Sequence, residues 1–349
     1  MRGRKETENH YREVMKNLLE DKPIVFKDYY VWLTKMEGLE ESTATKYIRD
    51  VLLLFEFMDK ELEYDMSLSI PELFNKLAIK KSNIQRFMVS GDVGASYANG
   101  RKASISKFYD FLMDDSGEIP FNPCKNIQQI KNKNKKVKIP LEKSEIQTLL
   151  YYASNPSEMN SLSATEKKKY MDYVSMWTLF IELAYTTGSR CGAITEICIE
   201  DIDFDRKIIH TIQKGNKAFD ICYSDTVAEA LKTWLKDRKR ILSSNGKESP
   251  YLFFWPLNFK KLDNRKCNLV LKDFGFRLKR DVTMHDFRHT CGTDLYEHCR
   301  DINQVAQVLG HSNIQTTQIY AHVSDRIKRE SVTIMDEMLS EKLNIKKRV

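Results

Sequence analysis

The chain has 349 residues, which is enough for two domains of ordinary size. With 42% hydrophobic and 30% charged residues, its composition is that of a soluble protein with substantial hydrophobic cores. No apolar run approaches the ~20 residues that span a bilayer, and the N-terminal stretch MRGRKETENHYRE lacks the apolar core of a signal peptide. Membrane-spanning and secreted proteins are therefore excluded, and we expect a cytoplasmic protein.

Cysteine spacing and net charge narrow the class further. Seven cysteines, an odd number, are spread from Cys124 to Cys299 without C-x-x-C spacing, which argues against a disulfide framework and against a zinc ribbon. The net charge of +7 permits a nucleic-acid partner without requiring one.

Residues 1–130 are predicted to form a helical domain. Ser42 is predicted to cap a helix whose apolar stripe reaches Phe55, Ser82 is predicted to cap a second helix, and a third apolar stripe covers residues 105–112. These stripes are expected to form the core. Basic side chains that fall off the stripes could reach a DNA backbone, although a solvated face explains each one equally well: Lys46, Arg49, Arg101, Lys102 and Lys107.

The composition changes between the two domains. Residues 125–143 hold seven lysines and one acid, so this short segment carries nearly the whole net charge. We interpret residues 131–140 as a basic interdomain linker that follows DNA phosphates, with a merely solvated run as the alternative. The lysines expected to contact phosphate are Lys131, Lys133, Lys135 and Lys136.

The second domain is expected over residues 141–349. Ser144 is predicted to cap its first helix, residues 154–168 are expected to be an inserted loop, and a hairpin is expected with its tip at Gly215-Asn216. Further helices are predicted over 173–185, 226–242, 268–278 and 324–343. The fold class is therefore mainly α with a small antiparallel β-sheet.

One stretch, residues 283–322, concentrates reactive side chains. It holds five of the seven histidines, and Arg288, His311 and Tyr320 fall within it. Histidine titrates near neutral pH, arginine offers a fork suited to phosphate, and a tyrosine hydroxyl can act as a nucleophile. A cationic pocket around a tyrosine suits phosphoryl transfer, because the developing charge lies on phosphate oxygens.

A zinc site is the alternative interpretation of this stretch. His285 and His289 are four residues apart, as zinc-binding pairs often are. Arg288 would then lie beside the metal, and no nearby cysteine or carboxylate has an obvious ligand geometry. We therefore expect no metal and no other cofactor, and a zinc hydrolase remains a rival.

Taken in chain order, the motifs resemble those of the tyrosine recombinase family, also called the phage integrase family. The matching pieces are TTGSR at 186–190, KGNK at 214–217, HDFRH at 285–289, LGH at 309–311, and Tyr320 nine residues after His311. Each piece alone is weak, but all of them in order over residues 141–340 form a strong signal.

The resemblance implies a role for each matched residue. Tyr320 would attack the scissile phosphate and give a 3′-phosphotyrosine, while Arg190 and Arg288 would hold the non-bridging oxygens. Lys214 would protonate the leaving 5′-oxygen, with Lys217 as the fallback candidate. His285 and His311 would donate hydrogen bonds to phosphate and assist proton transfer at Tyr320.

The chain departs from the family pattern at two positions. Three residues after Arg190, where an acid is common, it has Ala193, so Glu196 or another group would have to brace that arginine. Ser189 stands where an apolar residue is usual. These departures put the rate in doubt more than the chemistry.

The resemblance also implies partners and a biological role. We expect two domains that close around duplex DNA as a C-shaped clamp, a monomer in solution, and a homotetramer on DNA with a dimer at each site. Accessory DNA-bending proteins and association with the nucleoid are further expectations. Integration and excision of a mobile element is the first choice. Xer-like resolution of chromosome or plasmid dimers, a topoisomerase of the same chemistry, and a catalytically idle DNA-binding protein are the alternatives.

Overall fold

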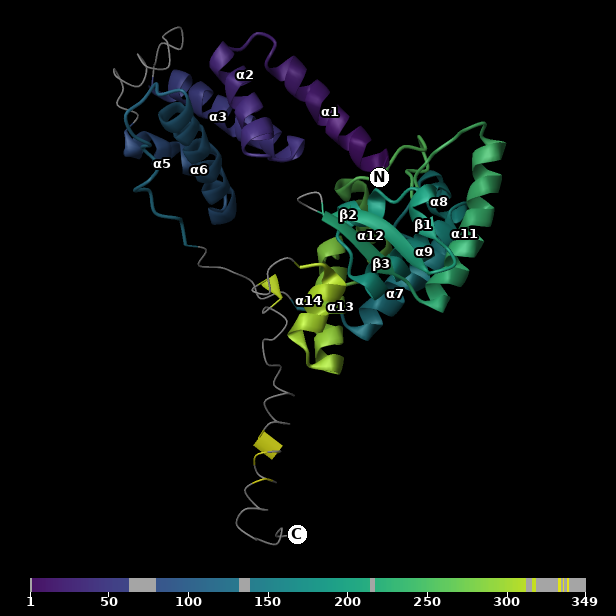
Figure 1. The fold of residues 1–349 in the computed structure, drawn as a ribbon. Coiled ribbons are helices and arrows are strands. Elements are labelled where there is room, and N and C mark those ends of the chain that lie inside the picture. The colour runs from purple at the N-terminus through teal and green to yellow at the C-terminus, as the bar shows by residue number, and fades with distance from the viewer. Residues whose placement is uncertain are drawn as a thin grey trace. The chain divides into compact units, whose positions relative to one another are not determined.

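The computed structural model describes residues 2–62, 80–131, 139–213, 217–311, 316–317, 332–333, 335 and 338. The chain divides into two compact units, one formed by Arg4–Val137 and the other by Lys138–Val349 with the first three residues (Figure 1). The division falls inside the lysine-rich segment. No helix among the described residues is long and apolar enough to cross a membrane.

The N-terminal unit is helical where it is described. Its core brings together aromatic side chains from α2, α3 and α6, including Phe26, Phe55 and Phe108. Two helices, α2 and α6, each continue into a short π-helical turn. The elements are α1 (Arg2–Leu18), α2 (Ile24–Val31), η1 (Trp32–Met36), α3 (Glu41–Leu62), α5 (Lys81–Val89), α6 (Ala95–Asp110) and η2 (Phe111–Asp115).

The second unit is built around α9 (Val174–Thr187), which contacts α7, α11 and α13. Most of α9 is apolar and buried, and its polar residues Ser175, Thr178, Glu182 and Thr186 share the one face that is partly exposed. Its other elements are α7 (Lys143–Ser154), η3 (Pro156–Glu158), α8 (Ala164–Met171), α10 (Cys191–Thr195), η4 (Ile199–Asp201), α11 (Asp225–Ser244), α12 (Asn264–Phe274), α13 (Met284–Cys299) and α14 (Ile302–Leu309).

A three-stranded antiparallel sheet completes this unit, in the order β1-β2-β3. The predicted hairpin is confirmed: β2 (Ile208–Gln213) pairs with β3 (Lys217–Cys222), with Ile209 opposite Ile221. The first strand, β1 (Ile202–Asp203), pairs with the start of β2 and was not predicted. A two-residue strand carries too little pattern to be seen in the sequence. The tip residues 214–216 lie outside the described part of the chain.

Four local predictions were wrong. Helix α3 begins at Glu41, so Ser42, which was predicted to cap it, lies inside the helix. Helix α7 is capped by Glu142, whose box with Glu145 supplies the helix start, so Ser144 lies inside the helix. Helix α5 is likewise preceded by Lys80, with Ser82 inside it. The expected loop 154–168 contains a helical turn and the start of α8, which is fixed by a capping box between Ser163 and Glu166.

Candidate active site

Arg288 of α13 joins the ends of two other helices. Its Nη1 donates to the carbonyl oxygen of Gly188 at 2.9 Å, and its Nη2 donates to that of Leu309 at 2.9 Å. Both carbonyls lie at helix C-termini, where cations are favoured. The Arg288 side chain is only 4% exposed. A guanidinium has five N–H donors, so a single arginine can hold both turns.

Gly188 ends α9 in the left-handed conformation, with φ +55°. A Cβ at this position would lie 2.6 Å from Leu309 Cδ2 and 3.0 Å from Cys291 Cβ. Both neighbours are buried. Glycine is required here twice over, for its backbone conformation and for the close approach of α9 to α13 and α14.

Arg190 also contacts the turn that follows α14. It is exposed and stands at the start of α10, and its Nη1 is 3.4 Å from the carbonyl oxygen of Gly310. The two arginines therefore contact consecutive carbonyls, those of Leu309 and Gly310. The structure thus brings TTGSR, HDFRH and LGH together from three distant parts of the sequence, in an arrangement suited to an anion.

The two histidines of the set differ in environment. His285 is exposed in the first turn of α13, which Thr283 and Asp286 close with a capping box. His311 is half-buried, and its Nδ1 is 2.8 Å from Thr317 Oγ1. The Thr317 side chain is fully buried, so this hydrogen bond holds the imidazole in place.

Burial and neighbouring groups together set the protonation state of His311. Its pKa is lowered to about 4, first by burial and further by Arg288, Arg190 and His285 nearby. His311 is therefore neutral at pH 7, with one nitrogen able to donate a hydrogen bond and the other to accept one. A bound phosphate would offset the positive charge and raise this pKa.

Over residues 140–326, more than half of the chain, the sequence matches the pattern of the Phage integrase family. The chain belongs to this family. The prediction of a tyrosine-type site-specific DNA recombinase is thereby confirmed. The relatives of this chain support the same enzyme class.

Curated relatives of this recombinase resemble it along most of its length. Tyrosine recombinase XerC of Chlorobaculum tepidum is 26% identical over 328 residues, 88% of this chain and 92% of the relative. Tyrosine recombinase XerD of Staphylococcus haemolyticus is 27% identical over 306 residues, 86% and 94% of the two chains. The XerC of Corynebacterium glutamicum is 32% identical over 168 residues, which cover 48% of this chain and 51% of that relative.

Solved structures show the same fold. The Tn1549 transposon integrase in complex with transposon right end DNA has a TM-score of 0.59 at 17% identity, covering 89% of this chain and 99% of that one. The post-cleavage complex of XerH with palindromic difH substrate also has a TM-score of 0.59 at 17% identity, covering 89% and 95%. The predicted class, mainly α with a small antiparallel sheet, is confirmed.

Two members of the predicted catalytic set, Lys214 and Tyr320, lie outside the described residues, so their roles in this recombinase stay predictions. Tyr296, the competing tyrosine, is described: it lies on α13, partly buried against the cluster of Cys291, Val305 and Leu309. Thr317 was not among the residues predicted to form the site. No motif marks a threonine six residues after the histidine that it holds.

The acid considered as a brace for Arg190 has a defined contact elsewhere. Glu196 forms an ion pair with Lys261 at 3.1 Å, and both side chains are about one-quarter exposed. A bracing role for Glu196 stays a hypothesis.

The predicted DNA contacts of the N-terminal unit differ in their surroundings. Lys46 pairs with the buried carboxylate of Asp50 at 2.6 Å. Arg101 donates to the carbonyls of Phe87 and Ser90, and Lys102 donates to that of Ile127. Lys46, Arg101 and Lys102 thus have hydrogen-bond partners within their own unit, and their contacts with DNA stay predictions. Arg49 and Lys131 are exposed, and Lys133, Lys135 and Lys136 lie outside the described residues.

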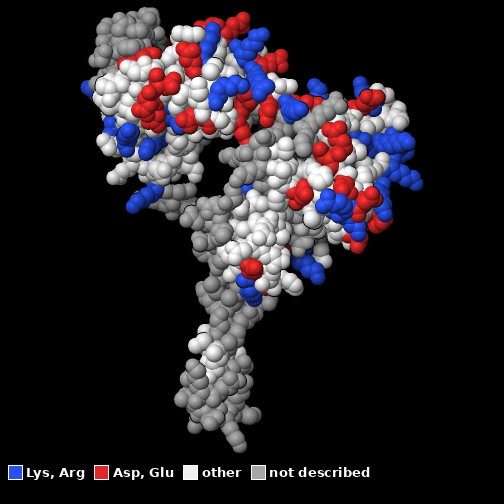
Figure 2. Space-filling view, in the orientation of Figure 1, with Lys and Arg blue, Asp and Glu red and all other residues white. Residues whose placement is uncertain are grey.

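A further group of cations was not singled out from the sequence. Figure 2 shows Lys and Arg side chains gathered over α11, where the exposed members are Lys232, Lys236, Lys239 and Arg240.

With regard to the zinc alternative, no group of three or more His, Cys, Asp or Glu among the described residues could hold a metal ion.

Proposed function

We propose that this recombinase cleaves and rejoins duplex DNA through a 3′-phosphotyrosine at Tyr320, in the integration and excision of a mobile element. The observation that carries the proposal is the meeting of three turns that gathers Arg190, Arg288 and His311. Such a cluster provides fixed positive charge for a phosphate whose oxygens gain negative charge in the transition state.

In the proposed step, the Tyr320 hydroxyl oxygen bonds to phosphorus and the bond from phosphorus to the 5′-oxygen breaks. The guanidinium groups of Arg190 and Arg288 hold the non-bridging oxygens. Neutral His311 can take the tyrosine proton or donate to the phosphate, and exposed His285 offers a second donor. Lys214 gives its proton to the leaving 5′-oxygen. The reverse attack by a 5′-hydroxyl of the second DNA completes strand exchange.

A suicide substrate, nicked so that the cleaved end diffuses away, tests this chemistry. The intact protein is expected to form a covalent adduct with the 3′ end, and Tyr320→Phe is expected to bind the same DNA without forming one. Tyr296→Phe is the matched control and should form the adduct normally. A protein that binds DNA and never forms an adduct would instead be the idle DNA-binding protein.

A Xer-like role in resolving chromosome or plasmid dimers is the second candidate. It is favoured by the match to proteins named XerC and XerD over 86–88% of this chain. Recombination assays on two plasmid substrates separate the two roles. One plasmid would carry direct repeats taken from the DNA that flanks the gene, and the other a chromosomal dimer-resolution site. Efficient recombination of only the second substrate would overturn the mobile-element role.

Assembly on DNA is proposed to use the C-terminal tail. Val332, Met335 and Met338 are helical and 69%, 64% and 47% exposed, so they form an apolar stripe that their own chain leaves open. We infer that the tail docks on a neighbouring protomer in a cyclic tetramer. We expect the protein to be a monomer in solution. We propose DNA-bending proteins as accessory factors for its assembly on DNA. Folding back of the tail onto its own domain is the alternative.

Deleting residues 324–349 distinguishes the two arrangements. Docking between protomers predicts that the truncated protein still binds a single site but loses cooperative binding of paired sites and recombination. Normal recombination by the truncated protein would rule out the docking role.

A further inference from the structure

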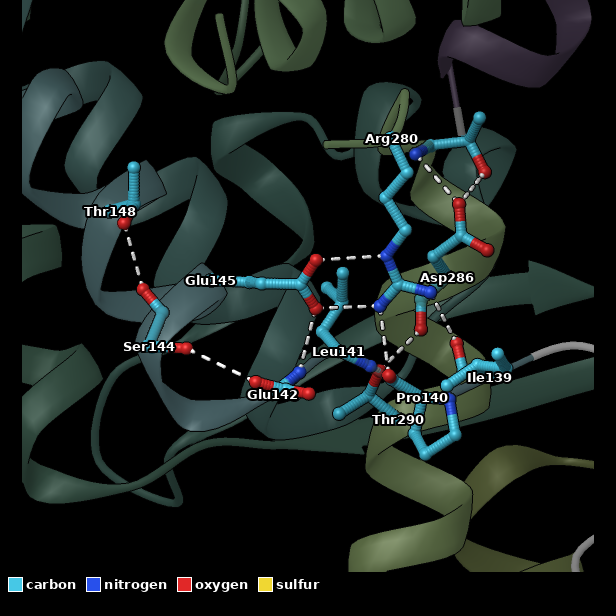
Figure 3. A network of polar contacts seen from close by, with 11 residues as sticks. Ile139, Pro140, Leu141, Glu142, Ser144, Glu145, Thr148, Arg280, Asp286 and Thr290 are labelled. Atoms are coloured by element: carbon cyan, nitrogen blue, oxygen red, sulfur yellow. Dashed lines mark hydrogen bonds and ion pairs between the residues drawn. The ribbon is translucent and has the colours of Figure 1, made fainter. Parts of the chain in front are cut away.

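Arg280 lies in the loop before α13, outside the catalytic set, and its guanidinium donates four hydrogen bonds (Figure 3). Nε and Nη2 donate to the two carboxylate oxygens of Glu145 at 2.9 and 2.7 Å. Nη1 donates to the carbonyl of Ile139, and Nη2 also donates to that of Pro140, both at 2.8 Å. All three nitrogens therefore hold the chain where it enters the second unit.

A second contact fixes the same segment to the catalytic helix. The amide of Leu141 donates to Thr290 Oγ1 at 2.8 Å, and the Leu141 side chain is buried in the core. Thr290 is fully buried on α13, two residues after Arg288. Residues 139–141 are thus held at three successive backbone groups, two of them by Arg280 in the loop before α13 and one by Thr290 of α13.

We call the contacts of Arg280 and Thr290 with residues 139–141 the clasp. Glu145 links the clasp to α7. Besides accepting from Arg280, its carboxylate accepts from the amide of Glu142 at 2.8 Å and closes the capping box of α7. Burial alone would raise its pKa, but hydrogen bonds from Arg280 and Glu142 outweigh that effect and hold the pKa below its usual range. The clasp therefore stays charged at neutral pH.

The segment that the clasp holds is the end of the lysine-rich run 125–143. We propose that Arg280 is a positioning residue for strand cleavage. It fixes the end of the lysine-rich run to α13, so that binding of the run to DNA sets the position of Arg288 and His285. The inference rests on the proposed function, because it assumes that the run follows DNA phosphates.

Lysine at position 280 would keep the charge and lose the clasp, because an ammonium is a single point and cannot serve a carboxylate and two carbonyls in one plane. Arg280→Lys is expected to slow cleavage of saturating suicide substrate by about 10-fold or more, since small misplacements of catalytic groups are costly. Its Kd for a single DNA site should stay within about three-fold of that of the unmodified protein.

Arg238→Lys provides the matched control. Arg238 also bridges to backbone carbonyls, donating from Nε and Nη2 to Tyr251 at 3.1 and 2.9 Å, but it lies on α11 and does not contact α13. Arg238→Lys should leave the cleavage rate unchanged. Thr290→Val and Thr290→Ser form a second pair, in which only the valine loses the hydroxyl that holds Leu141 and should slow cleavage.

A double-mutant cycle separates positioning from simple stabilisation. The four lysines Lys131, Lys133, Lys135 and Lys136 are replaced by glutamine, alone and together with Arg280→Lys. If the clasp acts through the lysine-rich run, the cleavage defects should not multiply, because either change alone breaks the same link. Defects that multiply, or Arg280→Lys cleaving within two-fold of the unmodified protein, would overturn the inference. Failure of the unmodified protein to cleave would instead overturn the proposed function.

Discussion

Replacing Gly188 by alanine is expected to damage the site through two separate strains. The first is conformational: at φ +55° an L-residue with a Cβ is disfavoured by about 1–2 kcal/mol. The second is steric: the new Cβ would lie 2.6 Å from Leu309 Cδ2 and 3.0 Å from Cys291 Cβ. The Leu309 tip could rotate only within a packed core, and Cys291 Cβ is fixed to α13.

The steric part is worth about 1–3 kcal/mol by comparison with other overpacked cores. Alanine also lowers the conformational entropy of the unfolded chain, which offsets about 0.4–1 kcal/mol of this destabilisation. Gly188→Ala should therefore destabilise the second unit by about 1–5 kcal/mol. It should also slow cleavage, because pushing Leu309 aside moves the carbonyl that holds Arg288.

Gly246→Ala is the matched control. Gly246 has φ +57° and nothing within 4 Å of an added Cβ, so it carries the conformational strain alone. Urea unfolding is followed by fluorescence of Trp177, Trp234 and Trp255, which lie in this unit. Equal loss of stability in the two variants would refute the close approach of α9 to α13 and α14.

Three further predictions concern protons and charge. Because the folded pKa of His311 is about 4 and its unfolded value near 6.5, stability should fall as pH drops from about 6.5 toward 4, and His311→Gln should lessen that fall in urea midpoints. An unchanged pH dependence in the variant would count against it. Lys214→Ala should slow cleavage by about 10²-fold or more, and a 5′-thio leaving group should restore most of the rate; no rescue would leave Lys214 as a phosphate contact only. Glutamine at Lys131, Lys133, Lys135 and Lys136 should flatten the salt dependence of DNA binding by about 0.9 per lost contact. Glutamine at the four exposed cations of α11, Lys232, Lys236, Lys239 and Arg240, should flatten the salt dependence of DNA binding less. Equal salt dependence in the two variants would mean that the lysine-rich run is only a solvated segment.

The motif order and spacing predicted the family, and the structure brings three of the motifs, TTGSR, HDFRH and LGH, together. The hairpin was also predictable, since apolar residues of strand type flank Gly215-Asn216. The helix starts predicted at Ser42, Ser82 and Ser144 were wrong. Helix α5 follows Lys80 and helix α7 follows Glu142, and residues of these types have a weaker average preference for the cap position.

Contacts between residues far apart in the sequence lay beyond sequence reasoning altogether. Arg280 and Glu145 are 135 positions apart, and neither belongs to a recognisable motif. The use of Arg288 to hold the carbonyls of Gly188 and Leu309 is likewise invisible, because backbone acceptors leave no trace in residue identity. Side-chain motifs predicted the chemistry, whereas the supporting framework of backbone contacts required the structure.

The covalent link itself tests the central claim most directly. The adduct trapped on a suicide substrate is digested with protease and nuclease, and the nucleotide-bearing peptide is identified by mass spectrometry. The account predicts a 3′-phosphate ester on the peptide that contains Tyr320. A link to Tyr296 or to any other residue, or a 5′-phosphate in place of the 3′-phosphate, would contradict it.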